Sequence, residues 1–137
     1  MTMMHTSTAS TILAHVKHTL SEESVSSVTV VGHSRGGAIA LLDGLYLSLQ
    51  LPNVTVNVTT YGMPRVGDLD FMSFVNIDSR LSGHVWHVNN MRDPIPILPF
   101  KRFGFSQLST EIHIQDTGEW DVCPGAFPSS RAWVWLD

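Results

Sequence analysis

One stretch of this 137-residue chain, from Ser27 to Leu42, places a strand, a tight turn with one serine and a helix directly after one another. Four strand-forming residues, 28–31, come before Gly32, and an Ala- and Leu-rich segment follows Gly36. The turn between them reads Gly-His-Ser-Arg-Gly, which fits the G-x-S-x-G pattern of a nucleophile elbow. In such an elbow a serine, here Ser34, lies in a sharp turn from a strand into a helix.

The elbow geometry assigns a chemical role to Ser34. Crowding at the turn predicts that the residues two before and two after the serine, Gly32 and Gly36, must lack side chains. The hydroxyl then projects from the carboxyl end of the sheet over a helix N-terminus, where free N–H groups stabilise an oxyanion. Ser34 is therefore the candidate nucleophile, and the backbone N–H of Arg35 is the candidate oxyanion donor. The alternative is an ordinary strand, turn and helix with a buried serine.

Length and composition exclude several classes of protein. A chain of 137 residues can form one domain with a core, but it is short for a complete doubly wound hydrolase. The net charge of −4 offers no basic surface for nucleic acid, and no apolar run is long enough to span a membrane. The one cysteine, Cys123, allows neither a disulfide within the chain nor a thiolate metal cluster. The first residues lack the pattern of a signal peptide.

The rest of the chain predicts further elements of an α/β fold. Residues 8–21 have the apolar spacing of an amphipathic helix, and the helix after the serine is expected to end near Leu49. Alternating valines in residues 54–59 predict the next strand, so strand, helix and strand form a βαβ unit with parallel pairing. A short helix is expected after Gly67. Residues 103–105 and 110–114 are expected to form a final hairpin-like β segment.

A third predicted strand, residues 84–88, runs into a loop that contains Asp93. Prolines at positions 94, 96 and 99 fix the backbone of this loop and prevent a helix. Asp93 follows a parallel strand, so it is expected at the same edge of the sheet as Ser34, where catalytic groups gather. Asp93 is the candidate acid that orients a histidine. On loop position alone, a solvated aspartate without a catalytic role is an equally open alternative.

Four motifs in this order resemble the fungal-type class 3 lipases, and the likeness extends from about Thr6 to Gly125. The motifs are Val28-Thr29-Val30-Val31-Gly32-His33-Ser34-x-Gly36-Gly37, Tyr61-Gly62-Met63-Pro64-Arg65-Val66-Gly67, Asn90-x-x-Asp93-x-x-Pro96-x-x-Pro99 and Glu111-Ile112-His113-Ile114. The resemblance implies an α/β-hydrolase fold that is partial here, a lipid or ester substrate at a lipid–water interface, no cofactor and no metal. It also implies a secreted parent protein. Residues 1–125 are expected to form the lipase-like domain, and residues 126–137 an unmatched tail.

By this resemblance Ser34 matches the nucleophile of the family and Asp93 its triad acid, while His33 matches a positional residue. The family's catalytic histidine lies beyond the Cys-Pro-Gly segment matched by residues 123–125, and no histidine follows His113 in this chain. The resemblance therefore predicts a chain that is truncated at both ends. His113 is the one in-chain substitute for the base, although an alternating Ile-His-Ile segment also suits a structural histidine.

These features lead to two functional hypotheses. The first is a carboxylic ester hydrolase of the triacylglycerol lipase type, impaired because the usual catalytic histidine is missing. The second is a non-catalytic lipase-like fragment that binds lipid or protein. The sequence leaves the oligomeric state open.

Overall fold

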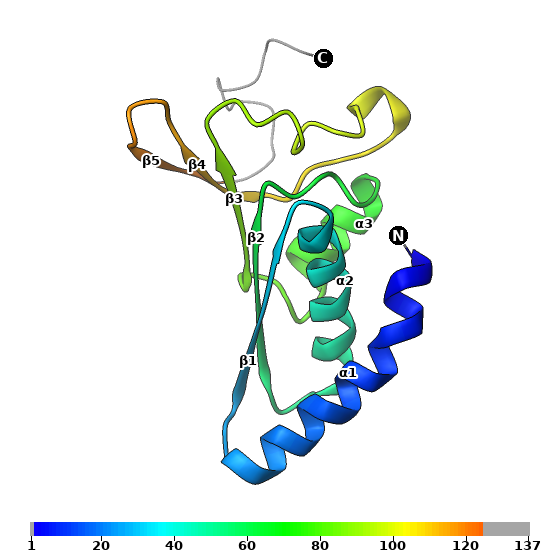
Figure 1. Cartoon of the computed structure of the whole chain (residues 1–137). Helices are drawn as coiled ribbons and strands as arrows, with labels where there is room; N and C mark the ends of the chain where they lie inside the picture. The colour runs from blue at the N-terminus through cyan, green and yellow to red at the C-terminus, as the bar shows by residue number, and fades with distance from the viewer. Residues whose placement is uncertain (1, 125–137) are drawn as a thin grey trace.

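The computed structural model describes residues 2–124, which form a five-stranded sheet with helices on one of its faces (Figure 1). The elements in chain order are α1 (Thr2–Glu23), β1 (Ser27–His33), α2 (Arg35–Gln50), β2 (Thr55–Tyr61), α3 (Leu69–Ser73), the π-helical turn η1 (Phe74–Asp78), β3 (Val85–Asn90), the 3-10 turn η2 (Lys101–Phe103), β4 (Thr110–Ile114) and β5 (Trp120–Pro124). Residues 126–137 lie outside the described part, so the division of the chain at residue 125 stays a prediction.

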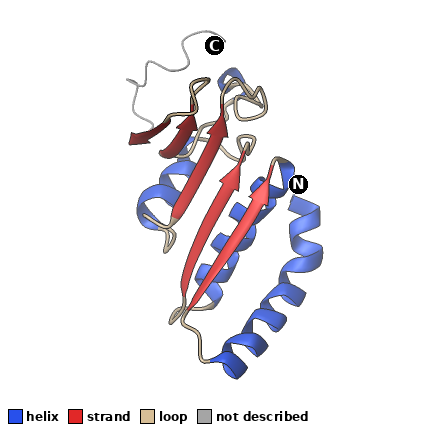
Figure 2. Ribbon diagram, turned by 60° about the vertical axis from the view of Figure 1, so that its left-hand side comes forward, coloured by secondary structure: helices blue, strands red, loops and turns tan. Residues whose placement is uncertain are grey.

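The sheet is mostly parallel, with the strand order β1-β2-β3-β4-β5. β1 to β4 pair in parallel, and β5 runs antiparallel to β4. Figure 2 shows the parallel strands with their carboxyl ends at one edge. The predicted βαβ unit is β1, α2 and β2. The predicted α/β fold with a mostly parallel sheet is therefore confirmed.

The hydrophobic core lies between the helices and one face of the sheet. Val56, Val58 and Val85 are buried on this face, and Leu41 and Leu47 of α2 pack against them with at most 1% of their surface exposed. Burying one leucine of this kind stabilises the fold by about 1.5 to 3 kcal/mol. The predicted amphipathic helix is α1, which is longer at both ends than residues 8–21. Its apolar side chains pack on the core through Ile12, Leu13, Val16 and Leu20.

Within residues 2–124, no helix covers the opposite face of the sheet (Figures 1 and 2). The register places Val31, Thr59 and Trp86 in one row across this open face. Val31 is 60% exposed and Trp86 42% exposed. β1 is also the first strand of the described sheet, so one of its edges has no strand partner there. An open apolar face beside an unpaired edge favours association with further protein segments.

The final β hairpin differs from the predicted one. The prediction that residues 103–105 form a strand with residues 110–114 is wrong, because Lys101–Phe103 form η2 and Gly104 ends it with φ +86°. This left-handed backbone stops an extended strand at that point. The antiparallel partner of β4 is β5, which follows the polar turn of residues 115–119.

A buried polar cluster joins β2, β3 and β4 on the helix-covered side. His87 is fully buried, and its Nδ1 lies 3.2 Å from the Thr60 hydroxyl. The side-chain amide nitrogens of Asn89 and Gln107 face His87 Nε2, and Asn89 Nδ2 also donates to Glu111 Oε1 at 2.9 Å. Burial lowers the pKa of His87 to about 4, against an opposing upward contribution from Glu111. The imidazole is therefore neutral in the folded protein at neutral pH.

The depressed pKa of His87 predicts a loss of stability in acid. The unfolded chain protonates this histidine near pH 6.5, whereas the folded chain does so only near pH 4. The free energy of unfolding is therefore highest above pH 6.5 and falls by up to about 3 kcal/mol as the pH is lowered to about 4. Urea unfolding at pH 7 and pH 4.5 measures this change. His87→Gln should flatten the dependence, and an equally steep loss in this variant would contradict the assignment.

Candidate active site

Ser34 lies in a sharp turn between β1 and α2. Its φ of 53° and ψ of −128° form a conformation that residues other than glycine rarely adopt. The Ser34 N–H donates to the Tyr61 carbonyl at 2.8 Å, and the Gly37 N–H donates to the Ser34 carbonyl at 2.9 Å. The turn is therefore held by the neighbouring strand β2 and by the first turn of α2. This is the backbone geometry expected of a nucleophile elbow.

Two glycines crowd this turn, and one of them is not the predicted one. A Cβ on Gly32 would lie 2.3 Å from the Gly36 carbonyl oxygen, so no side chain fits at Gly32. A Cβ on Gly36 would meet nothing within 4 Å among the described residues, so the prediction that Gly36 must lack a side chain is wrong here. Gly36 faces outward at the start of α2. Gly37 is the buried neighbour, and its Cβ would lie 3.1 Å from that of Met63.

The backbone N–H of Arg35 lies beside the serine at the start of a helix. α2 begins at Arg35, and the first N–H groups of a helix have no acceptor within it. The positive end of the helix dipole adds to the attraction for negative charge at this point. The position of this N–H therefore suits an oxyanion donor, and its role stays a prediction.

Asp93 lies just past the carboxyl end of β3, as expected. Its N–H donates to the Asn90 carbonyl at 3.1 Å, and its Oδ1 accepts from the Ile95 N–H at 2.9 Å. The second carboxylate oxygen, Oδ2, faces Gly62, where a Cβ would lie only 2.7 Å from it. Gly62 also has φ +55°, which favours glycine. No local sequence pattern indicates either constraint on Gly62, because both arise only in the folded chain.

The carboxyl ends of β1, β2 and β3 bring Ser34, Gly62 and Asp93 to one edge of the sheet. A Cβ on Gly62 would also lie 3.9 Å from His33 Nε2, so Gly62 lies between His33 and Asp93. The strands that carry the serine and the aspartate are two strand spacings apart, about 10 Å. The structure therefore places both predicted side chains at the same edge, with glycine between them.

Arg65 fixes the loop that carries Asp93. Its side chain is 7% exposed, and its Nη1 donates to the carbonyls of Ile97 at 2.9 Å and Pro99 at 3.1 Å. Its backbone N–H donates to the Leu98 carbonyl at 2.7 Å. Arg65 thus ties the turn after β2 to the loop after β3. The sequence pattern did not indicate this role, because the contacts join segments more than thirty residues apart.

His113 is the last but one residue of β4 and lies near the carboxyl end of the sheet, but three strands away from the strand that leads into Ser34. It pairs with Asn89 in the sheet, and its Nδ1 lies 3.4 Å from Glu111 Oε1. β4 is three strand spacings from β1, about 14 Å. The structure does not bring His113 and Ser34 together, and the assignment of His113 as the base stays a prediction. His33 directly precedes Ser34 in the chain.

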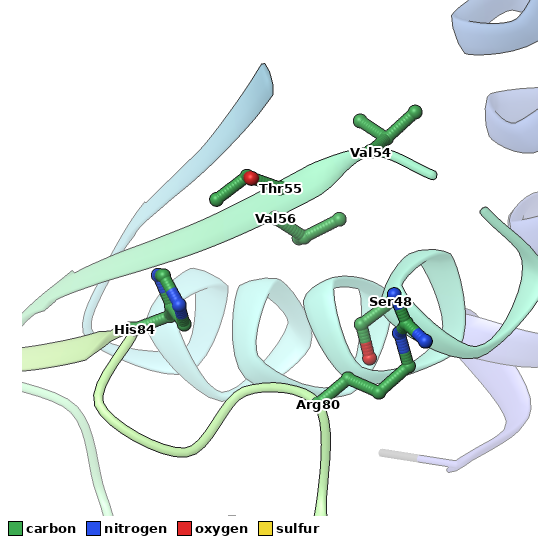
Figure 3. A pocket seen from close by; sticks show the side chains of 6 residues that line it. All are labelled: Ser48, Val54, Thr55, Val56, Arg80 and His84. Atoms are coloured by element: carbon green, nitrogen blue, oxygen red, sulfur yellow. The ribbon is translucent and has the colours of Figure 1, made fainter. Parts of the chain in front are cut away.

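A cavity of about 120 Å³ lies away from the predicted site (Figure 3). It is lined by Ser48, Val54, Thr55, Val56, Arg80 and His84. These residues lie in the last turn of α2, at the start of β2 and in the segment that leads from η1 into β3, whereas Ser34 follows the carboxyl end of β1. The cavity therefore lies at the opposite edge from the serine. Within residues 2–124, no group of three or more His, Cys, Asp or Glu side chains could hold a metal ion.

Fold, elbow and motif order together define a serine hydrolase-type domain, and the chain belongs to the class 3 lipase family. Residues 1–103 match the family model described as Lipase (class 3). The chain is 35% identical over 116 residues to the secreted mono- and diacylglycerol lipase MDL2 of Malassezia globosa, covering 83% of this chain and 38% of that protein. It is also 35% identical over 94 residues to the secreted mono- and diacylglycerol lipase 2 of Gibberella zeae, covering 64% and 23%.

Solved structures of lipases share the fold. A triacylglycerol lipase whose catalytic centre is formed by a serine protease triad matches with a TM-score of 0.82 and 28% identity, over 93% of this chain and 49% of that one. Lipase II of Rhizopus niveus matches with a TM-score of 0.78 and 29% identity, over 87% and 45%. The chain thus spans less than half the length of these relatives. None of the described helices is long and apolar enough to cross a membrane.

The glycine contacts predict opposite effects for two neighbouring substitutions. Gly32→Ala should destabilise the chain by about 2 kcal/mol or more, because the new methyl group would overlap the backbone of α2. Gly36→Ala should stabilise it by up to about 1 kcal/mol, because alanine favours a helix and the position is open. Urea unfolding of both variants measures the difference. Equal destabilisation by the two changes would show that Gly36, like Gly32, must lack a side chain.

Loss of the Arg65 contacts should loosen the loop after β3. Arg65→Met removes the donor to two carbonyls and is expected to cost about 2 to 4 kcal/mol. Arg92→Met is the matched control, because the Arg92 side chain is 87% exposed and pairs only at the surface with Asp116. Thermal unfolding of both variants gives the comparison. A similar melting temperature for both variants would show that Arg65 does not fasten the loop.

Proposed function

We propose that this chain carries the nucleophile and the acid of a lipase-type carboxylic ester hydrolase. The observation that carries the proposal is the strained elbow of Ser34, at the same edge of the sheet as Asp93. Family membership supports the ester hydrolase chemistry. The relatives named mono- and diacylglycerol lipases and a triacylglycerol lipase support acylglycerols as the substrate class.

In the proposed reaction, Ser34 Oγ attacks the carbonyl carbon of the ester while a histidine takes its proton. The negative charge that develops on the carbonyl oxygen is stabilised by the Arg35 N–H and the positive end of α2. Asp93 accepts a hydrogen bond from the histidine, which holds it in the tautomer needed to receive the proton. The alcohol then leaves with that proton, and water releases the acid from the serine.

The rate of hydrolysis that we expect depends on whether a histidine can reach Ser34. His113 lies on β4, about three strand spacings from the serine strand, and contacts Glu111. Without a base, only the oxyanion donor and substrate binding accelerate the reaction, and the loss is several orders of magnitude. We therefore propose that the 137-residue chain alone is a slow ester hydrolase.

Labelling with a fluorophosphonate probe tests the proposal, because such a probe reacts with an activated serine. We expect slow labelling of the purified, folded chain and no labelling of Ser34→Ala. If a histidine of the chain serves as the base, Asp93→Asn should slow the reaction further, because the acid no longer orients that histidine. Hydrolysis of short- and long-chain acylglycerols by the same samples then measures the substrate class.

His113→Ala serves as the test of the in-chain base. Loss of labelling in this variant would support the proposal and assign the base to His113, while unchanged labelling would support it and exclude His113. A folded chain that takes up no probe would overturn the proposal. That result would favour the alternative, a non-catalytic lipase-like fragment.

A further inference from the structure

An exposed turn at the catalytic edge combines aromatic and basic side chains. The segment Leu98–Phe103, here called the basic–aromatic turn, contains η2. Phe103 is 63% exposed and Leu98 is 37% exposed, and the side chains of Lys101 and Arg102 are also exposed. The Arg102 guanidinium lies 4.7 Å from the centroid of the Phe100 ring and 5.0 Å from that of Phe103. These stacked contacts hold cation and rings together on one protrusion.

The basic–aromatic turn lies at the same edge of the sheet as Ser34. The chain leaves β3 at its carboxyl end and forms this turn before it returns to β4, and Figure 1 shows the turn in yellow beyond the arrowheads of the parallel strands. Two backbone hydrogen bonds fasten the segment to the turn after β2. The Arg65 N–H donates to Leu98 at 2.7 Å, and the Ser106 N–H donates to Gly67 at 2.9 Å. The exposed aromatic ring is therefore held in place and is not a loose loop tip.

Charge distinguishes this turn from the exposed apolar patch on β5. On β5, Trp120 and Val122 are 63% and 62% exposed, but Glu119 and Asp121 flank them. A negatively charged surface is repelled by these carboxylates and attracted by the two adjacent cations of the basic–aromatic turn. The chain carries a net charge of −4, so its attraction to such a surface depends on a local cluster of this kind.

We propose that the basic–aromatic turn anchors the chain on a lipid surface that carries negatively charged headgroups. Phe103 enters the boundary between headgroups and acyl chains, while Lys101 and Arg102 contact the phosphates. The edge of the sheet that holds Ser34 then faces the lipid. The purpose of this anchoring rests on the proposed function, but the binding itself requires no reaction at the serine.

Vesicle sedimentation tests this proposal with the purified 137-residue chain. We expect more binding to vesicles of phosphatidylcholine with phosphatidylglycerol than to phosphatidylcholine alone. Each basic residue near an anionic membrane contributes about fivefold in affinity. The double variant Lys101→Gln/Arg102→Gln should therefore lower binding by about twentyfold or more. Phe103→Ala should lower it by about fivefold to tenfold.

Two matched variants control for general effects of charge and apolar surface. Lys17→Gln removes one exposed cation from α1, and Phe74→Ala removes a ring that is 39% exposed on η1. Both should bind the vesicles as the unaltered chain does, and circular dichroism should show that all variants fold. Equal losses in the control variants, or no preference for phosphatidylglycerol, would overturn the proposal.

The Ser34→Ala variant separates this proposal from the proposed function. It should bind the vesicles fully while it takes up no fluorophosphonate. Vesicle binding without labelling of the unaltered chain would refute the hydrolase proposal alone. Labelling without vesicle binding would refute the anchoring proposal alone.

Discussion

The parallel register of β1, β2 and β3 is the constraint on which the candidate site depends. Ser34, Gly62 and Asp93 each follow a different one of these strands, and backbone hydrogen bonds fix the lateral distance between the strands at about 4.8 Å per step. The described helices cover only one face of the sheet, so the register is also set by the valines that must point toward them. The same packing that buries the core thus aligns the three chain positions at one edge.

Around this edge, backbone groups hold the site more than contacts between its side chains do. The Ser34 turn is fastened through the Tyr61 carbonyl, and Asp93 is fastened through its own loop. Arg65 ties the turn after β2 to the loop that carries Asp93 by donating to carbonyls of that loop. None of these contacts uses the Ser34 hydroxyl or Asp93 Oδ2.

The sequence predicted the elements whose signals are local. The strand before Ser34, the helix after it and the βαβ unit followed from β-branched runs and from small and helix-forming residues. The hairpin partner of β4 was mispredicted because Gly104 could belong to a strand or end a turn, and only the folded chain decides. The contacts of Arg65 and the open side of Gly36 depend on segments distant in sequence, which no local pattern encodes.

β1 is an edge strand of the described sheet, so the strained backbone of Ser34 depends on how firmly this edge strand is held. An edge strand opens more readily than a central one, because hydrogen bonds secure it on one side only. The strained backbone of Ser34 therefore follows the strand that can most easily move to a relaxed conformation. A segment that paired with the free side of β1 would increase the fraction of molecules in which the serine is held in its elbow. The population of this serine conformation would then depend on a contact at a distance from the serine.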